Sequence, residues 1–328
     1  MAFANANISD IVATTMANRS RKVADNVTEN NIILKQLSMK GKIKPISGGN
    51  EIYQELSFAE NTNAGWYSGY DILPVGVSDV ISAAEFDIKQ AAVPVVISGL
   101  EQLQNSGPER MIDLMDARIS VAESTMKNLI SDGLYSDGNG AGGKQIDGLK
   151  RAVPLDPTTG TYGGINRADP IGAFWQTQLV DPTAALGLNP DNIAGYWNTL
   201  YTECARGSDL TDLILCDNTV WAAYVAALQN LQRFSTPEVG DLGFPTLKFM
   251  GADVFFDGGI GGYCPAGTAF FLNCDYLHYR PHSKRNMVPI SPDRRYATNQ
   301  DAEVQILGWA GNLTCSGSQF QGRFSAIT

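Results

Sequence analysis

The sequence predicts an α+β fold built from two units, and three observations predict it. A run with helical period covers residues 108–131, an alternating pair of strands precedes it, and short strands alternate with helices after residue 189. The chain has 328 residues and is 44% apolar, so it is long enough for one large domain or for two domains with hydrophobic cores.

Charge is distributed unevenly along the chain. Residues 1–44 hold seven Lys or Arg and three acidic residues, which gives a net charge of +4. The whole chain carries −10, so the remainder carries −14. Such an acidic chain is not typical of a dedicated nucleic-acid-binding protein.

Cysteine usage and apolar runs bear on the compartment. The five cysteines are an odd number without a Cys-x-x-Cys pair. This is typical of reduced thiols in the cytoplasm and not of a disulfide scaffold or a zinc site. No N-terminal charged region precedes an apolar run, and no stretch approaches 18 apolar residues. Neither a secretion signal nor a membrane span is therefore expected.

Residues 1–44 are predicted to form a polar, basic N-terminal arm. One short amphipathic helix is indicated near residues 8–15, and a second by Thr28 as its cap followed by Ile32, Ile33 and Leu37. Neither helix can bury enough surface to be stable alone. The arm is therefore expected to lie against another surface, which could belong to a neighbouring chain.

Residues 45–84 are predicted to form a long hairpin. Ile52 and Leu56 alternate with polar residues, and residues 75–88 are predicted as the returning strand. Two strands alone are marginal in water, so the hairpin is expected to need a partner surface. Its aromatic tip residues, Trp66, Tyr67 and Tyr70, are predicted as anchors for that contact. The alternative is that they pack against the hairpin itself.

Residues 108–131 are predicted to form one amphipathic helix about 36 Å long. Pro108 marks its start and Gly133 its end, and the side opposite the apolar stripe is polar as far as Ser131. The apolar stripe consists of Met111, Ile112, Leu114, Met115, Ile119, Ala122, Met126, Leu129 and Ile130.

Arg118 interrupts this apolar stripe. A charge in that position must reach water or meet a carboxylate. We therefore predict that Arg118 forms an ion pair, within the subunit or across a subunit boundary. The alternative is that its side chain extends to the edge of the stripe.

The rest of the chain is predicted to form a mixed second unit. A glycine-rich loop covers residues 133–149, and the turn-rich residues 150–190 are expected to lie on the surface. Pro190 opens a helix, and Asp217 or Asn218 caps another. Strands are predicted at residues 213–216, 247–256, 268–273 and 276–280. Residues 303–328 are mostly strand-like and are expected to return to the first unit.

No catalytic constellation is evident in the sequence. Residues 138–144 match the spacing of a phosphate-binding loop, but Gln145 replaces the Ser or Thr that would hold magnesium, and a helix precedes the loop where that motif needs a strand. The two histidines, His278 and His282, are separated by Pro281, and no acid or cysteine is placed to complete a metal site. No Gly-x-Ser-x-Gly elbow exists. We therefore expect no catalytic residues, no cofactor and no metal.

Several segments carry a resemblance to a known family. They are AGWYSGYDILP with VSDVISAAEFDIKQAAVPVVISG, LYSDGNGAGGKQIDGL, LKFMGADVFFDGG, FFLNCDYLHYRPHSKRNMVP and VQILGWAGNLTCS. In amino-acid sequence and in order along the chain they resemble the major capsid protein of tailed bacteriophages, whose fold is shared with herpesvirus capsid floors. Together they cover about two-thirds of the chain.

The resemblance implies the tailed-phage major capsid fold. Its parts are an N-terminal arm at residues 1–44, an extended hairpin loop over an adjacent subunit at 45–84, a peripheral domain at 85–180 with the spine helix at 108–131, an axial domain at 181–300 and closing strands at 301–328. The implied function is self-assembly through pentamers and hexamers into an icosahedral shell enclosing double-stranded phage DNA. Trp66, Tyr67, Tyr70 and Arg118 are then expected at contacts between subunits.

The resemblance also implies partners and a location. A portal protein at one vertex, a scaffolding protein and decoration proteins are expected partners, without a membrane, and the shell is expected to form in the host cytoplasm and to be part of the virion. Only about 44 residues precede the hairpin, too few for an independent domain, so scaffolding is expected to be a separate protein.

The charge distribution agrees with this function. The basic arm can face nucleic acid or an acidic neighbour, while the acidic remainder avoids tight binding, so contact with packaged DNA is expected to be non-specific. Two other interpretations remain open. One is the same fold used as a cellular nanocompartment that encloses an enzyme, and the other is an unrelated metabolic enzyme.

Overall fold

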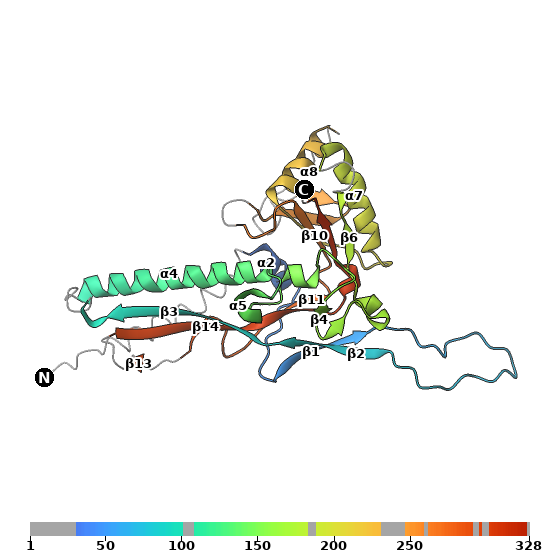
Figure 1. Ribbon diagram of the computed structural model, residues 1–328, viewed down its shortest axis with the longest axis horizontal. Helices are drawn as coiled ribbons and strands as arrows, with labels where there is room; N and C mark the ends of the chain where they lie inside the picture. The colour runs from blue at the N-terminus through green and yellow to red at the C-terminus, as the bar shows by residue number, and fades with distance from the viewer. Residues whose placement is uncertain are drawn as a thin grey trace.

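The computed structural model describes residues 31–100, 108–182, 188–230, 247–258, 262–290, 295–296 and 302–326. Its helices and strands are α2 (Ile32–Met39), β1 (Glu51–Ser57), β2 (Ile81–Asp87), β3 (Lys89–Ser98), α4 (Pro108–Leu134), α5 (Gly140–Gly143), α6 (Leu149–Ala152), β4 (Thr161–Tyr162), β5 (Ile165–Asn166), η1 (Pro170–Trp175), β6 (Gln178–Val180), α7 (Pro190–Glu203), β7 (Leu213–Cys216), α8 (Asn218–Asn230), β8 (Leu247–Phe249), β9 (Ala252–Phe256), β10 (Thr268–Leu272), β11 (Leu277–Pro281), β12 (Val288–Pro289), β13 (Arg295–Tyr296), β14 (Ala302–Cys315), η3 (Ser318–Phe320) and β15 (Gly322–Ser325). Figure 1 shows an elongated first unit, a second unit standing on one end of it, and a hairpin loop that projects away from both.

Strand β14 organises the sheet of the first unit. It pairs along one edge with β3 and along the other with β11, β12 and β13, all antiparallel. Helix α4 lies along β3 and β14 (Figure 1) and buries Ile119, Ala122, Met126 and Ile130. The predicted long amphipathic helix is confirmed over residues 108–131. The side chains of stripe residues 111–115 lie outside the part that the structure describes.

The helix differs from the prediction near its end. It continues through Gly133 to Leu134, and a Cβ at Gly133 would approach Cδ1 of Ile146 to 3.0 Å, so a glycine allows close packing there. Leu129, predicted in the apolar stripe, is 43% exposed. Ser131, predicted on the polar side, is buried and accepts a hydrogen bond from Nδ2 of Asn31 at 3.1 Å. At its C-terminal end, the buried face of α4 is therefore directed toward Asn31, the residue that precedes α2.

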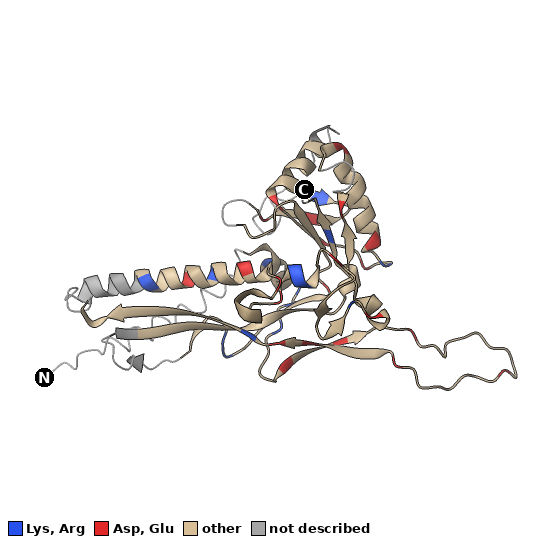
Figure 2. Ribbon diagram, in the orientation of Figure 1, with Lys and Arg blue, Asp and Glu red and all other residues tan. Residues whose placement is uncertain are grey.

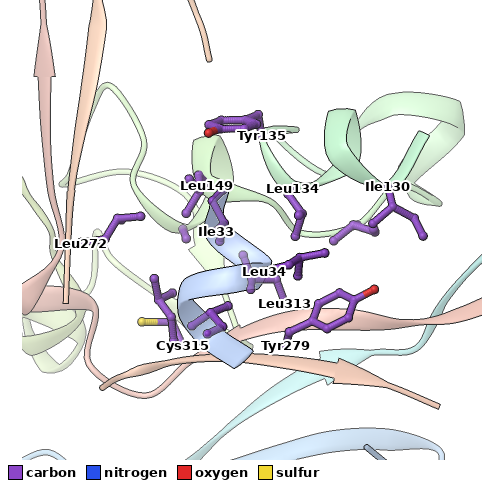
Figure 3. Close-up of a cluster of buried hydrophobic side chains, with 14 of the residues drawn as sticks. Ile33, Leu34, Ile130, Leu134, Tyr135, Leu149, Leu272, Tyr279, Leu313 and Cys315 are labelled. Atoms are coloured by element: carbon purple, nitrogen blue, oxygen red, sulfur yellow. The ribbon is translucent and has the colours of Figure 1, made fainter. Parts of the chain in front are cut away.

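Helix α2 lies inside the core of its own chain. Asn31 caps it by accepting a hydrogen bond from the N–H of Leu34 at 3.2 Å, so Thr28 is not the cap. Thr28 and the helix predicted near residues 8–15 lie outside the described residues. Figure 3 shows Ile33 and Leu34 of α2 among Ile130, Leu134, Leu149, Leu272, Tyr279, Leu313 and Cys315. For α2, the suggestion that the arm lies on a neighbouring chain was wrong.

Two lysines of the predicted arm bind acids of the second unit. Lys40 forms an ion pair with Asp212, and Nζ of Lys42 lies 3.4 Å from Oδ1 of Asp275. Ile43 and the residues after it follow β11, with the N–H of Lys44 donating to Tyr279 at 3.0 Å. Part of the arm's basic charge is therefore neutralised within the subunit.

The second unit is a six-stranded sheet in the order β6-β15-β10-β7-β9-β8. Helices α7 and α8 cover one face, where Trp197 stacks on Tyr224 with ring centroids 4.5 Å apart. The opposite face adds Phe255 and Phe270 to the core of the first unit. The predicted helices of this unit and its strands at 213–216, 247–256 and 268–273 are confirmed, whereas the strand predicted at 276–280 belongs to the sheet of the first unit. Asp217 caps α8 by accepting from the N–H of Thr219 at 3.3 Å, and it also accepts from the Thr219 hydroxyl at 2.7 Å.

The chain crosses between the two sheets more often than predicted. Strand β14 returns to the first unit, but β15 pairs with β10 and β6 of the second sheet. The prediction that all of residues 301–328 return to the first unit was therefore wrong. The reason is that β10 and β6 each have an edge whose backbone groups need partners, and β15 supplies them. Strands β11 and β12, from residues 181–300, belong to the first sheet.

The turn-rich residues 150–190 were expected on the surface, and this was wrong for their central part. Tyr162, Arg167 and Trp175 are each 1–2% exposed. Trp175 donates its indole N–H to the carbonyl of Tyr162 at 2.9 Å, and Tyr162 packs edge-on against Phe86 of β2. The central part of this segment, residues 161–175, therefore contains buried side chains and packs against β2 at the base of the hairpin.

Candidate assembly surface

The base of the predicted hairpin is a short two-stranded ladder. Strands β1 and β2 pair antiparallel from Glu51↔Asp87 to Ser57↔Ile81. One face, with Ile52 and Leu56, is buried in the hydrophobic cluster that also contains Tyr162 and Trp175. The returning strand begins at Ile81 and not at residue 75, because Pro74 lacks an N–H donor and glycine disfavours strand structure. The long connection from residue 58 to residue 80, here called the projecting loop, is therefore not a strand ladder.

Polar contacts shape the projecting loop. Nδ2 of Asn63 donates to the carbonyl of Gly76 at 2.7 Å and links the two sides of the loop. At the tip, the N–H of Ser68 donates to Oδ2 of Asp71 at 2.8 Å, and the N–H of Asp71 donates back to the Ser68 carbonyl at 3.0 Å. Residues 68–71 at the tip therefore form a hydrogen-bonded turn that contains Tyr70.

Large apolar side chains of the projecting loop face solvent. Trp66 and Tyr70 are completely exposed and Tyr67 is 67% exposed, so the alternative that the tip aromatics pack against the hairpin is wrong. Four neighbouring apolar residues that sequence reasoning did not predict as contacts are also between 51% and 99% exposed: Ile72 and Leu73 in the tip, and Val75 and Val77, which it assigned to a strand. Pro74 and Gly76 between them were the signal that this segment is not a strand. Contiguous exposed apolar surface marks a site of interaction.

Charge on the hairpin has one sign. The projecting loop contains Glu60, Asp71 and Asp79 and no basic residue (Figure 2). On the ladder below it, Glu51 lies directly opposite Asp87. The pKa of Tyr53 is raised by the negative charges of Glu51 and Glu85. A partner surface that complements this hairpin is therefore apolar with a polar or basic rim.

Arg118 lies in a different part of the molecule from the projecting loop. Its Nη1 donates to the carbonyl of Val96 on β3 at 2.6 Å. It lines a groove of about 400 Å³ between β3 and α4, together with Val93, Pro94, Val95, Val96, Ala117, Val121, Ala122 and Thr125. The structure therefore shows a contact with a backbone carbonyl, and the ion pair remains a prediction.

The glycine-rich loop is ordered by contacts with β14. Nδ2 of Asn312, a fully buried residue, donates to Oδ2 of Asp147 at 2.8 Å and to the carbonyl of Asp87 at 2.9 Å. Asp147 also pairs with Arg151 at 2.9 Å. These bonds fix the loop against the sheet and the base of the hairpin. Sequence reasoning missed Asn312, although an amide inside an apolar strand is a signal of a buried polar contact.

The two histidines lie in different surroundings. His278 is buried in β11, while Nδ1 of His282 accepts the N–H of Lys284 at 3.1 Å. Within the described ranges, no group of three or more His, Cys, Asp or Glu side chains is placed to hold a metal ion. The described helices include none that is long and apolar enough to cross a bilayer.

Burial, with Lys44 and Arg280 nearby, lowers the pKa of His278 to about 4. His278 takes up a proton near pH 6.5 in the unfolded chain, but not until about pH 4 in the folded chain. The contribution of neutral His278 to the free energy of unfolding is therefore present at neutral pH and is lost as the pH falls. We expect this residue alone to lower the free energy of unfolding by about 2 kcal/mol between pH 7 and pH 5. Urea titrations of the unassembled subunit measure it. His278→Gln should lose this part of the pH dependence, and an unchanged pH profile in that variant would contradict the prediction.

Known proteins resemble this chain in fold but not detectably in sequence family. No protein-family model and no curated protein sequence matches the chain. Among solved structures, the capsid asymmetric unit of cyanophage A-1(L) is similar with a TM-score of 0.63 at 16% identity, covering 88% of this chain and 92% of that chain. The capsid of Myoviridae phage XM1 has a TM-score of 0.53 at 12% identity, covering 89% and 92%.

A third structure comes from a different kind of particle. The holo-SrpI encapsulin complex from Synechococcus elongatus PCC 7942 is similar with a TM-score of 0.50 at 10% identity, covering 87% of this chain and 84% of that chain. All three similarities extend over most of the chain, between 87% and 89% of it. The chain therefore has the fold of tailed-bacteriophage capsid proteins.

Proposed function

We propose that the chain is the major capsid protein of a tailed bacteriophage, which self-assembles through pentamers and hexamers into an icosahedral shell around double-stranded DNA. The observation that carries the proposal is the projecting loop. The loop extends away from the core of its own subunit (Figure 1). Its aromatic and aliphatic side chains are exposed, which is typical of a surface that contacts another molecule. The similarity of the fold to phage capsid proteins supports the proposed role in a shell.

The parts of the chain take separate roles in this proposal. The first unit is the peripheral domain with α4 as its spine, the second unit is the axial domain, and residues 45–84 are the extended loop that lies over an adjacent subunit. Trp66, Tyr67 and Tyr70 are contacts to that subunit. Contacts of this kind between unlike surfaces close into rings. Each can be weak, because a subunit held by several neighbours leaves only when all its contacts break together.

The proposed partners follow from the role in a shell. They are other copies of the chain, a portal protein at one vertex, a separate scaffolding protein, decoration proteins, and packaged DNA bound without sequence preference. The proposed locations are the host cytoplasm during assembly and the virion afterwards. The role is structural and needs no catalytic step.

A cellular nanocompartment is the second candidate, and the similarity to an encapsulin favours it. Electron microscopy and analysis of particle contents, on the chain expressed alone and on an infected host, test both functions. Closed particles from the infected host that enclose nucleic acid support the phage shell, and closed particles of the chain alone that enclose a host enzyme support the nanocompartment. The absence of closed particles from both sources contradicts both functions.

Salt is expected to favour assembly. Residues 45–328 carry −14, and Lys40 and Lys42 of the arm already bind acids of their own subunit, so repulsion between subunits is expected to exceed the attraction from the arm. Salt screens charges beyond about 8 Å at physiological strength. Light scattering of purified subunits across a salt series should therefore show faster assembly at higher salt. Faster assembly at low salt would mean that the attraction from the arm dominates.

A further inference from the structure

Strand β3 lies at the edge of the sheet in the first unit. Among the described strands it pairs with β14 alone, over the ten residues from Lys89 to Ser98. A long edge strand presents unpaired N–H and C=O groups, which are a template for pairing with a strand of another chain. Two side chains, one on β3 and one on α4, occupy this edge.

Backbone bonds of β14 identify which residues of β3 point toward the free edge. The Ile306 carbonyl accepts from the N–H of Ile290, and the Ala310 carbonyl accepts from the N–H of His282, both at 2.8 Å, so these β14 residues point away from β3. Ile306 is the partner of Pro94 in the register of β3 and β14. Because bonded and non-bonded pairs alternate in an antiparallel ladder, the even-numbered residues of β3 direct their backbone groups outward.

Pro94 is therefore in the one orientation that an edge proline allows. It lacks an N–H, so it removes a donor from the middle of the free edge. The next even-numbered residue is Val96, whose outward carbonyl accepts the 2.6 Å hydrogen bond from Nη1 of Arg118. At this point of the edge the donor of one residue is missing and the acceptor of the next is taken.

Arg118 also fills space beside the strand. It extends from α4 to β3 at the groove that both elements line. A pairing strand would lie about 4.8 Å from β3, in the position that the guanidinium group occupies. Such a strand would have to displace a charged group from its hydrogen bond.

We propose that Pro94 and Arg118 form an edge guard, which prevents strands of other copies from pairing with β3. The proposal gives a reason for an arginine within the apolar stripe of α4, since its guanidinium group lies at the outward carbonyl of Val96 on the edge of β3. It implies that other molecules contact this surface through side chains and not by strand addition. It does not depend on the chain being a shell protein.

Variants of the two residues test the edge guard. Pro94→Val restores an outward N–H, and Arg118→Met frees the Val96 carbonyl while keeping an unbranched apolar stem. We expect the double variant to shift from single subunits to polymers with an infrared band of intermolecular β-structure, by more than the sum of the two single variants. Lys127→Met is the matched control, because it removes one positive charge from α4 outside the groove lining.

Two outcomes of the variant series would overturn the proposal. One is a double variant that stays as single subunits at concentrations where the wild type does. The other is a control that polymerises as much as Arg118→Met does, because loss of charge would then be the cause.

Hydrogen exchange of the unassembled wild-type subunit provides a test that does not depend on the folding of variants. The outward amides of Ala92 and Val96 should exchange faster than the amides of Val93 and Val95, which face β14. Equal protection of Val95 and Val96 would show that the edge is already paired, and the edge guard would then have nothing to protect.

Discussion

Deletion of residues 60–70 is expected to abolish closed particles while leaving a folded, soluble subunit. The ladder of β1 and β2 and its contacts with Tyr162 remain in this variant, so the hydrophobic core is unchanged. The deletion removes Trp66, Tyr67 and Tyr70, whose side chains are largely or completely exposed and are not part of the core. Electron microscopy measures assembly, and circular dichroism with thermal unfolding measures folding.

A smaller change makes the same test sharper. Trp66→Ser combined with Tyr70→Ser keeps the loop length and should give the same loss of particles. Tyr53→Ser is the matched control, because Tyr53 is an aromatic residue of the same hairpin, 59% exposed, outside the projecting loop. Normal particles from the double variant, or an equal loss from the control, would show that the loop tip is not the assembly contact. An unfolded deletion variant would show that the loop is needed for the subunit itself.

Substitution of Arg167 by Met is expected to lower the free energy of unfolding by about 3 kcal/mol. The buried guanidinium donates to the carbonyls of Ala152 at 2.6 Å, Trp175 at 3.2 Å and Arg151 at 3.2 Å, and to Oγ of Ser318 at 3.3 Å. Methionine fills similar volume but leaves these acceptors buried without a donor. Burial lowers the pKa of Arg167 because desolvation disfavours the charged guanidinium group, so the group depends on these hydrogen bonds to offset part of that cost.

Arg206 is the control for this substitution. It pairs with Asp209 at 3.2 Å and lies over the ring of Phe320, but its side chain is 65% exposed, so Arg206→Met should cost less than about 1 kcal/mol. Urea unfolding of unassembled subunits measures both variants. Equal losses in the two variants would show that the four acceptors around Arg167 find other partners.

The regular elements could be predicted because their signals are local. The apolar period of α4, Pro190 at the start of α7 and the uninterrupted apolar run of β7 each specify an element without reference to the rest of the chain. Positions fixed by tertiary contacts could not be predicted. Ser131 is buried because Asn31, one hundred residues away, donates to it, and no local pattern contains that contact.

The residues of the candidate assembly surface also fall into those that local sequence predicted and those that depend on tertiary contacts. Trp66, Tyr67 and Tyr70 were predicted as anchors because two strands alone are marginal in water and need a partner surface, and their exposure in the structure agrees with that prediction. The role of Arg118 could not be predicted, because it depends on which edge of β3 is free and on the direction of the Val96 carbonyl. The placement of β15 in the second sheet likewise depends on which strand edges need partners, and sequence periodicity does not contain that information.

Cryo-electron microscopy of particles formed by the purified chain tests the central claim most directly. The account predicts closed shells built from fivefold and sixfold clusters, with residues 58–80 of each copy lying on a neighbouring copy and Trp66 and Tyr70 buried in that contact. Particles that do not close, or a projecting loop that folds back onto its own subunit with its aromatic residues still exposed to solvent, would contradict it.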